Sequence, residues 1–426
     1  MQAMKQIEAF LTKRKKLGIK PGLERMELLL KLLQHPERQL TAIHIAGTNG
    51  KGSTSEYIKQ GLQANGYKVG VFTSPSLTGL RGHIVFENEP ISEKSFLVSW
   101  EEVYPAIESL DEKGMHPTEF EILTAIAFLF FSRHAEIAVI EAGMGGREDT
   151  TNCLHPIISI ITTIAKDHTA FLGDTITDIA SHKAGIIKRK TPVIIGELPQ
   201  EANAVVKDEG VSKQAPIYQL GKQFYFRQLP CSDNQQNMEW NLAGEKPIQL
   251  ALSMYGKHQL ANASLALMAL HLLRQKGLAL EFVCVQSAFK KAKLEGRFEL
   301  VSQQPLVIVD GAHNPEGIKA FKDTVESYFP NRERHLLFAV FKDKDMDRMI
   351  GQLQHTFASI HLTTFDHPRA ASIGELQKFE VKNKIQIHPS WIKAVKQMKC
   401  QEAVYFITGS IHFISLVRAY LKQRNK

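Results

Sequence analysis

One short segment near the amino terminus constrains the fold of this chain most. Thr41–Ala46 is an apolar run with β-branched residues, and it leads directly into the glycine-rich stretch Gly47–Ser53. Good helix formers continue to about Asn65, Gly66 stands where a helix terminator is expected, and Tyr67–Phe72 is again strand-like. This order of strand, glycine-rich loop, helix and strand predicts a βαβ unit, and with it a parallel sheet covered by helices.

Strands and helices alternate along the chain in two blocks. In the first block a helix is expected at Thr118–Ser132, and polar, strand-like fragments extend from about Gln200 to Lys246 before helical periodicity returns at His258–Arg274. Helices between buried strands predict a mostly parallel sheet in each block. The further strands are expected at Ile137–Ile140, Ile157–Ile164, Pro192–Ile195, Leu306–Val309, His335–Phe341, Ile360–Phe365 and Val404–Ile407.

The glycine-rich loop has the chemistry of a phosphate site. Its small residues let backbone N–H groups close around phosphate oxygens, and Lys51 supplies a mobile positive charge. The loop departs from the usual G-x-x-x-x-G-K-[ST] pattern, because its first glycine would fall at Ile45 and Gly52 stands where a hydroxyl residue normally follows the lysine. A tight turn that merely joins strand to helix is the alternative. The flanking strand and helix favour nucleotide binding.

The length of 426 residues exceeds what one hydrophobic core usually supports, so two domains are expected. We expect residues 1–294 to form a P-loop NTPase-like α/β domain with a mostly parallel sheet. Residues 297–426 should form a smaller, Rossmann-like α/β domain, with a linker at about 293–296.

The composition of the chain limits its expected cellular location and its expected binding partners. A formal charge of +8, from 52 basic and 44 acidic residues, is spread along the chain, so it suits anionic small molecules and does not indicate nucleic acid. Four cysteines without a C-x-x-C spacing argue against a disulfide framework. The longest apolar run, Ile122–Phe131, is too short to span a bilayer. We expect a cytoplasmic monomer without a membrane partner.

Acidic and histidine side chains follow two further strands of the first block. Glu141 closes an apolar strand, and Asp167 and His168 follow the strand Ile157–Ile164. Because the carboxyl ends of parallel strands meet at the ligand-binding edge of a sheet, these side chains could hold Mg²⁺ beside a nucleotide. The alternatives are a solvated acid and a structural histidine.

Two other segments carry candidate residues. Lys183 lies on an expected helix facing the same edge, although its chemistry alone predicts only a surface lysine. Asp310 and His313 follow a strand of the second block and could hold a ligand. Alternatively, Asn314 caps the next helix and Pro315 takes its first position, and both interpretations can hold together.

A series of segments resembles the Mur ligase superfamily, and within it the folylpolyglutamate synthase family, which includes bifunctional dihydrofolate synthases. The resemblance runs from about Leu17 to Ala419, and the irregular phosphate loop is itself the family's form. The matching segments are 18–26, 44–53, 72–75, 118–121, 141–152, 167–168, 183–188, 296–299, 310–314 and 408–410.

The resemblance implies that ATP phosphorylates a substrate carboxylate, and that the amino group of L-glutamate attacks the acyl phosphate to form an amide. The substrate would be a folate, dihydropteroate or both. A carboxylate is a poor electrophile until one of its oxygens becomes a phosphate leaving group, so electrostatic clamping of the transferring phosphoryl group is the main catalytic demand.

The resemblance also implies the roles of individual residues, and it places ATP between the two domains. Lys51, His168 and a carbamylated Lys183 would serve catalysis, and Ser74, Glu141 and His168 would bind magnesium. Residues matching substrate contacts are Phe120, Glu148, Asp149 and Thr150. Residues matching nucleotide contacts are Thr48, Asn49, Gly50, Lys51, Gly52, Ser53, Asn262, Arg297, Asp310 and His313.

The chain departs from the family pattern around the site. Ser76 and the stretch Gly82–Ile84 replace a histidine and Glu-Arg-Ile, which affects the substrate loop. His182 stands where a glutamate normally precedes the modified lysine, and Leu294-Glu295 replaces Trp-Pro. A related ligase acting on another carboxylate, such as a cell-wall precursor, and a diverged, non-ligating nucleotide-binding protein remain the alternatives.

Overall fold

The computed structural model describes residues 2–18, 20–232, 235–381 and 384–424. Ile19, within the first of the matching segments, lies outside them. The chain divides into two compact units: Met1–Leu252 with Leu260–Ala292, and Ser253–Gln259 with Lys293–Lys426. Over the described ranges, no helix is both long and apolar enough to cross a bilayer.

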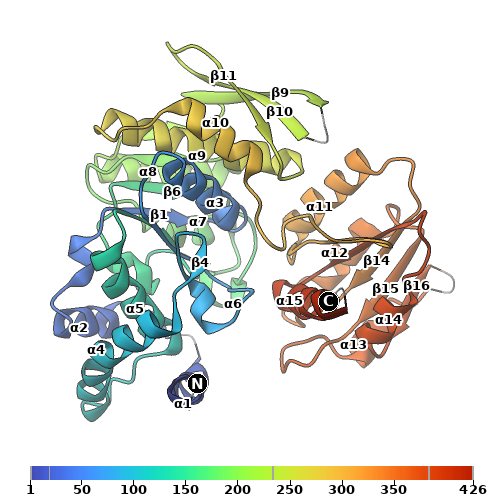
Figure 1. Cartoon of the computed structure of the whole chain (residues 1–426), viewed down its shortest axis with the longest axis horizontal. Coiled ribbons are helices and arrows are strands. Elements are labelled where there is room, and N and C mark those ends of the chain that lie inside the picture. Colours follow the sequence, from blue (N-terminus) through green and yellow to red (C-terminus); the bar gives the residue numbers. More distant parts are fainter. Residues whose placement is uncertain (1, 19, 233–234, 382–383, 425–426) are drawn as a thin grey trace. The chain divides into compact units, whose positions relative to one another are not determined.

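The first unit is built on an eight-stranded sheet of order β4-β3-β2-β5-β1-β6-β7-β8 (Figure 1). Neighbouring strands from β2 to β8 pair in parallel, whereas β3 and β4 are antiparallel additions at one edge. The predicted mostly parallel sheet is therefore confirmed. The strands are β1 (Ala42–Ala46), β2 (Val69–Phe72), β3 (Ile84–Phe86), β4 (Glu89–Pro90), β5 (Ile137–Glu141), β6 (Ile158–Ile161), β7 (Val193–Ile195) and β8 (Ile217–Gln219).

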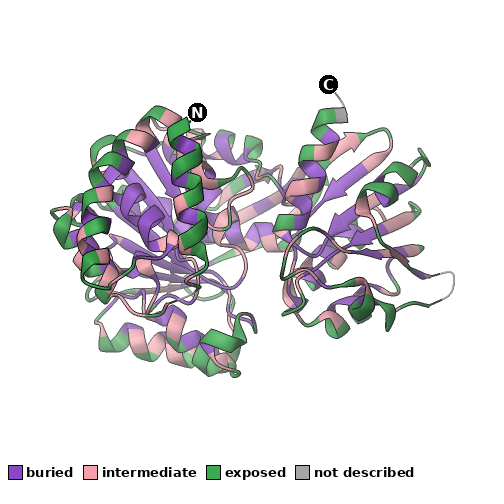
Figure 2. Ribbon diagram, turned by 90° about the horizontal axis from the view of Figure 1, so that it is seen from below, coloured by how far each residue is buried: buried purple, intermediate pink, exposed green. Residues whose placement is uncertain are grey.

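Two hydrophobic clusters among the described residues pack helices against this sheet. One joins helices α1, α2, α4 and α5 to β2 and β5, and the other joins α7 and α8 to β6 and β7. Figure 2 shows buried strands and helices whose outer faces are exposed. The helices are α1 (Gln2–Lys15), α2 (Glu24–Leu32), η1 (Pro36–Gln39), α3 (Lys51–Gln63), η2 (Leu80–His83), α4 (Glu93–Glu112), α5 (Glu119–His134), η3 (Thr150–Cys153), α6 (Thr169–Leu172), α7 (Ile176–Ala184), α8 (Gln200–Ser212), α9 (Lys257–Gln275) and α10 (Phe282–Lys291).

The region from about Gln200 to Lys246 differs in part from its prediction as strand-like fragments. It begins with helix α8, whose buried residues Ala202, Val206 and Gly210 recur every four positions. Their small number and the polar surroundings gave only a weak helical pattern. A three-stranded antiparallel sheet of order β11-β10-β9 follows, made of β9 (Phe224–Ser232), β10 (Gln235–Leu242) and β11 (Ile248–Leu252).

The second unit contains a six-stranded sheet of order β12-β13-β17-β14-β15-β16, parallel except for β12. Its core includes Phe298, Phe321 and Phe406. The strands are β12 (Glu299–Gln303), β13 (Leu306–Val309), β14 (Arg334–Phe338), β15 (Ser359–Thr363), β16 (Ile385–His388) and β17 (Val404–Thr408). The helices are α11 (Pro315–Tyr328), α12 (Met346–Leu353), α13 (Ile373–Gln377), α14 (Trp391–Gln397) and α15 (Ile411–Arg424).

Candidate active site

Four neighbouring strands bring the first unit's candidate residues to one edge of its sheet. β2, β5, β1 and β6 lie side by side, with Phe72 paired to Ile140 and Ile45 paired to Glu141. The glycine-rich loop leaves β1 at this edge, Glu141 ends β5, and Ser74 follows β2 by two residues. Asp167 and His168 follow β6. The predicted convergence of these segments on one edge is thus present in the structure.

Glycines let the loop after β1 lie against its neighbours. Gly50 has φ 91°, and a Cβ at this position would come within 2.4 Å of Asn262 Oδ1. A Cβ at Gly47 would come within 1.9 Å of Thr162 Oγ1. Lys51, the first residue of α3, donates from Nζ to the Gly47 carbonyl at 2.9 Å. The structure therefore places Asn262, a residue far along the chain, directly beside the loop.

The segment after β6 braces the same loop. The Thr163 hydroxyl accepts from the Asn49 backbone N–H at 2.9 Å and donates to the Asn49 carbonyl at 3.0 Å. The Thr48 hydroxyl bonds the backbone of Ala165, whose carbonyl is 3.1 Å away and whose N–H is 3.0 Å away. Thr163 and its neighbour Thr162 were not predicted as site residues. Their position at the end of an apolar strand beside the loop was the available signal.

Lys183 is a buried lysine among charged groups of the site. It lies on α7 with 4% of its surface exposed. Burial and the Lys51 ammonium lower the pKa of Lys183 to about 7, against the opposite influence of Asp167 and Asp149. A substantial fraction of the amine is therefore neutral at pH 7, whereas a surface lysine is almost wholly protonated. A neutral amine is a nucleophile, so this site suits covalent modification.

The chemistry of the proposed metal ligands suits Mg²⁺. Glu141 is a buried carboxylate with 2% of its surface exposed, and Ser74 and His168 lie at the same edge. Within the described ranges, no group of three or more His, Cys, Asp and Glu side chains is placed to hold a metal ion. Mg²⁺ usually keeps several waters and binds through one or two carboxylates and substrate phosphates, and the Glu141 carboxylate and the Ser74 hydroxyl are oxygen ligands of this kind.

A second glycine-rich loop follows β5 and is organised around Asp149. Its carboxylate accepts from the Met144 N–H at 2.8 Å and from the Thr151 N–H and hydroxyl at 3.1 and 2.5 Å. Burial raises the pKa of Asp149, and these hydrogen bonds act against that increase. His44, a residue that sequence reasoning did not single out, contacts the Thr151 hydroxyl through Nε2 at 2.8 Å. Burial lowers the pKa of His44 to about 3, so the imidazole is neutral.

The four predicted substrate residues have different surroundings. The Phe120 ring packs beside Gly143, where an added Cβ would come within 2.6 Å of the ring. Glu148 contacts His182 Nδ1 at 2.6 Å, and the Thr150 hydroxyl contacts the Thr124 hydroxyl at 2.8 Å. Asp149 bonds its own loop. The Phe120 ring also packs against Phe72, with 5.5 Å between the ring centroids, so all four side chains contact the protein.

The second unit places Arg297, Asp310 and His313 near the carboxyl end of β13. The Asp310 carboxylate accepts from the backbone N–H groups of Phe298 and Ala312, both at 2.8 Å. Burial raises the pKa of Asp310, whereas Arg297 and these N–H groups act to lower it. His313 Nδ1 contacts the Gly311 carbonyl at 2.8 Å.

The start of α11 fits the structural interpretation of the same segment. Asn314 is its N-cap and accepts from the Gly317 N–H at 2.8 Å, and Pro315 is its first residue. The prediction that Asn314 caps this helix is therefore confirmed.

Comparison with known proteins tests the family resemblance. The Mur ligase middle domain matches residues 45–270, and the Mur ligase glutamate ligase domain matches residues 296–411. Dihydrofolate synthase/folylpolyglutamate synthase of Bacillus subtilis (strain 168) is 37% identical over 426 residues, covering 96% of this chain and 97% of that protein. The chain belongs to this family of Mur ligases. The resemblance inferred from the sequence is confirmed, and the protein is an ATP-dependent ligase.

Solved structures agree with this assignment. Mycobacterium tuberculosis folylpolyglutamate synthase complexed with ADP superposes with a TM-score of 0.90 at 29% identity, covering 98% of this chain and 97% of that chain. E. coli FolC in complex with DHPP and ADP superposes with a TM-score of 0.86 at 26% identity, covering 98% of each chain. The predicted combination of two α/β domains is confirmed as the fold of this ligase.

The loop of residues 76–83, to which the resemblance assigns substrate contacts, departs from the family pattern and is closed by its own hydrogen bonds. The Thr73 N–H donates to the His83 carbonyl at 3.0 Å, and His83 Nδ1 contacts the Thr73 carbonyl at 2.8 Å. The Thr78 N–H donates to the Ser76 hydroxyl at 3.1 Å. A Cβ at Gly82 would come within 2.2 Å of the Ser76 Oγ, so Gly82 fits these small hydroxyl residues. The departures at positions 76 and 82 are therefore mutually compatible.

Proposed function

We propose that this ligase adds L-glutamate to a folate, with tetrahydrofolate or dihydropteroate as the acceptor of the glutamate. A carboxylate oxygen of the acceptor attacks the γ-phosphorus of ATP, and the bond to the β-phosphate oxygen breaks to release ADP. The glutamate nitrogen then attacks the acyl carbon and loses a proton, while phosphate leaves. The products are an amide, ADP and phosphate.

One observation carries the proposal: a phosphate loop and a buried, reactive lysine face the same edge of the first sheet. Lys51 begins α3, and Lys183 on α7 is close enough for the Lys51 charge to lower its pKa. The glycine-rich loop supports binding of phosphates by backbone N–H groups at the start of α3. Lys51 then neutralises charge that develops on the transferring phosphoryl group.

Mg²⁺ is proposed to bind at Ser74, Glu141 and His168, where it neutralises phosphate charge when bound. Lys183 is proposed to carry a carbamate. Its neutral amine attacks the carbon of CO₂, an N–C bond forms, and one proton is released. The product is an anionic oxygen group at a position that otherwise holds a buried positive charge, and this removes the cost of burying an ammonium beside Lys51.

The proposed nucleotide contacts are the loop residues 48–53 with Asn262, and Arg297, Asp310 and His313 of the second unit. Phe120 is the proposed contact for the pteridine ring, because aromatic rings stack favourably and Phe120 is held at the edge by its contact with Gly143. Glu148, Asp149 and Thr150 remain predicted substrate residues. We place the enzyme in the cytoplasm as a monomer acting on small molecules.

The test is phosphate release from ATP by the purified enzyme with dihydropteroate or tetrahydrofolate, each with and without L-glutamate. We expect glutamate-dependent release with at least one acceptor, and the products distinguish dihydrofolate formation from polyglutamylation. Glutamate-independent release alone would support a diverged nucleotide-binding protein. Glutamate-dependent turnover only with another carboxylate would support the related ligase.

A further inference from the structure

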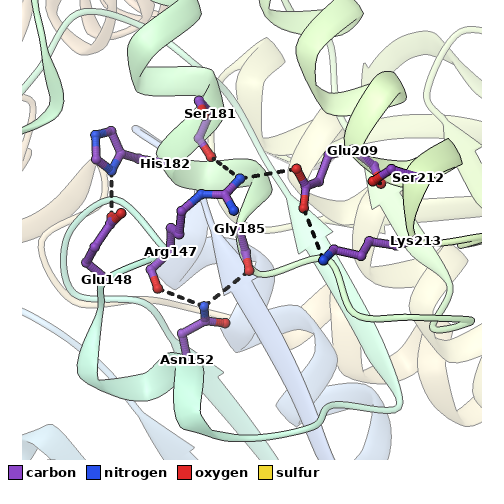
Figure 3. Close-up of polar contacts among 9 residues, drawn as sticks. All are labelled: Arg147, Glu148, Asn152, Ser181, His182, Gly185, Glu209, Ser212 and Lys213. Atoms are coloured by element: carbon purple, nitrogen blue, oxygen red, sulfur yellow. Dashed lines mark hydrogen bonds and ion pairs between the residues drawn. The ribbon is translucent and has the colours of Figure 1, made fainter. Parts of the chain in front are cut away.

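The last turn of α7, which carries Lys183, is sealed by the loop that follows β5 (Figure 3). The last carbonyls of a helix have no partner within the helix. The Arg147 backbone N–H donates to the His182 carbonyl at 2.7 Å, and the Arg147 guanidinium donates to the Ser181 carbonyl at 3.3 Å. The loop therefore supplies donors to the helix end beside Lys183.

The loop and the helix meet backbone to backbone. A Cβ at Gly146 would come within 2.8 Å of the His182 carbonyl oxygen and 3.1 Å of the Lys183 carbonyl oxygen. A Cβ at Gly185 would come within 2.4 Å of the Arg147 Cβ. No side-chain layer can fit at these two points of approach, so a small displacement of the loop is transmitted directly to the turn that carries Lys183.

The buried side chain of Asn152 joins the loop to the end of α7 by two hydrogen bonds. Only 6% of its surface is exposed, and its Nδ2 donates to the Arg147 carbonyl at 3.0 Å and to the Gly185 carbonyl at 3.1 Å. The backbone carbonyl of Asn152 accepts from Lys188 Nζ at 2.8 Å. A primary amide has two N–H donors on one nitrogen, so one side chain can join a carbonyl of the loop to a carbonyl at the helix end.

The outer contacts of the same cluster also join the loop to its neighbours, but their side chains are more exposed than that of Asn152. Arg147 pairs with Glu209 at 3.1 Å, and Glu148 pairs with His182 at 2.6 Å. The Arg147 side chain is 43% exposed, and the side chains of Glu148 and His182 are 38% and 30% exposed. Water and salt screen such pairs. Asn152 is the buried member of the cluster.

We propose that Asn152 is a positioning residue that fixes Lys183 relative to Glu141 by joining the Arg147 and Gly185 carbonyls. The loop begins directly after Glu141, and Gly185 follows Lys183 by two residues. Loss of the two donors lets the end of α7 move away from the loop. Lys183 then gains solvent and the position for its carbamate is lost. This inference rests on the carbamylation of Lys183 in the proposed function.

The experiment compares Asn152→Ala and Asn152→Asp with Asn65→Ala. Asp keeps the volume of Asn and lacks the two N–H donors, so this variant leaves no cavity and remains testable if the alanine variant does not fold. Asn65 is a matched control because it also bridges two segments of the first unit: its Nδ2 donates to Gly61 O at 2.8 Å, and its Oδ1 accepts from the Glu281 N–H at 2.7 Å. Asn65 lies beyond the end of α3, whereas the phosphate loop lies at its start.

Four quantities are measured for each full-length protein. They are the carbon-13 NMR signal of the Lys183 carbamate in labelled bicarbonate, the kcat and KM of glutamate-dependent phosphate release, and the melting temperature. In both Asn152 variants we expect carbamate occupancy and kcat to fall about 10-fold, with the KM for ATP little changed. A loss of this size is typical when a residue that holds a ligating side chain in place is removed. Raising the bicarbonate concentration should restore part of both losses. Asn65→Ala should lower only the melting temperature.

Wild-type occupancy and kcat in both Asn152 variants, with only a lower melting temperature, would overturn the positioning role. An equal loss of occupancy in Asn65→Ala would also overturn it, because the effect would then be general destabilisation. Absence of the carbamate signal or of glutamate-dependent turnover in the wild-type enzyme would instead overturn the proposed function. The two failures are therefore distinguishable.

Discussion

Two glycine-rich loops leave neighbouring strands at the same edge of the first sheet. One leads into the amino end of a helix, and the other contacts the carboxyl end of a different helix. The loop after β1 runs into the amino end of α3, where backbone N–H groups point outward. The loop after β5 gathers around Asp149 and seals the carboxyl end of α7. Glycine in the first loop permits close approach to Asn262 and, in the proposed function, to a phosphate. In the second it permits close approach of backbone to backbone. Glycine content alone therefore does not identify a phosphate site.

The largest difference between the loops should appear at Lys51. We expect Lys51→Ala to lower turnover by about 1000-fold, because the transferring phosphoryl group loses a positive charge that is proposed to neutralise it, while the melting temperature stays unchanged. Steady-state phosphate release and thermal unfolding measure the two effects. Lys94→Ala, on the exposed face of α4, is the control for loss of a lysine. Near-normal turnover in Lys51→Ala would remove the distinction between the two loops.

Asp149 tests the opposite property, that the second loop is held by its own hydrogen bonds. Asp149→Asn replaces one acceptor oxygen by a donor that faces other donors. We expect a loss of about 2–4 kcal/mol in the free energy of unfolding, measured by urea denaturation. Turnover should also fall, because Gly143 and the Phe120 ring beside it would shift. Unchanged stability with a raised KM for the folate would instead make Asp149 a direct substrate contact.

The order of strands and loops along the sequence predicted that both loops lie at one edge of the sheet. The apolar run before Gly47 and the one ending at Glu141 identify two parallel strands, and parallel strands end at a common edge. The contact between His44 and Thr151 was not predictable in the same way. It depends on β1 lying between β5 and β6, and local patterns do not specify that strand order. The hydrogen bonds between Asn49 and Thr163 were not predictable for the same reason, because they join residues that are 114 positions apart in the sequence.

Lys183 is influenced by both loops, because Lys51 of the first loop lowers its pKa and the second loop contacts the helix end that carries it. The pKa of Lys183 predicts how carbamate occupancy should change with pH. With a pKa of about 7, the neutral amine increases as the pH rises through 7. At fixed bicarbonate the ratio of carbamate to neutral amine is constant, so occupancy should rise by up to about 10-fold between pH 6 and pH 8 and then level off. Carbon-13 NMR at several pH values measures this. Occupancy that rises only above about pH 9 would show that Lys183 titrates as an ordinary lysine.

The brace from Thr163 should have a moderate effect confined to the first loop. Thr163→Val keeps the side-chain volume and removes both hydrogen bonds to Asn49. We expect the KM for ATP to rise by about 5–20-fold, since two modest hydrogen bonds that order the loop are lost. The occupancy of the Lys183 carbamate should not change. A lower occupancy with an unchanged KM would mean that Thr163 supports the second loop instead.

The smallest effect is expected at Glu148, which is a predicted substrate residue and also the partner of His182. The pair lies 2.6 Å apart and is more than a quarter exposed on both sides. If its role is the ion pair, Glu148→Gln and His182→Gln should each change stability by less than about 1 kcal/mol and turnover by less than about 3-fold, because solvent screens the interaction. The double variant separates the interpretations. An ion pair predicts that the two changes are not additive, whereas a substrate contact predicts a rise in the KM for the folate with Glu148→Gln that His182→Gln does not reproduce.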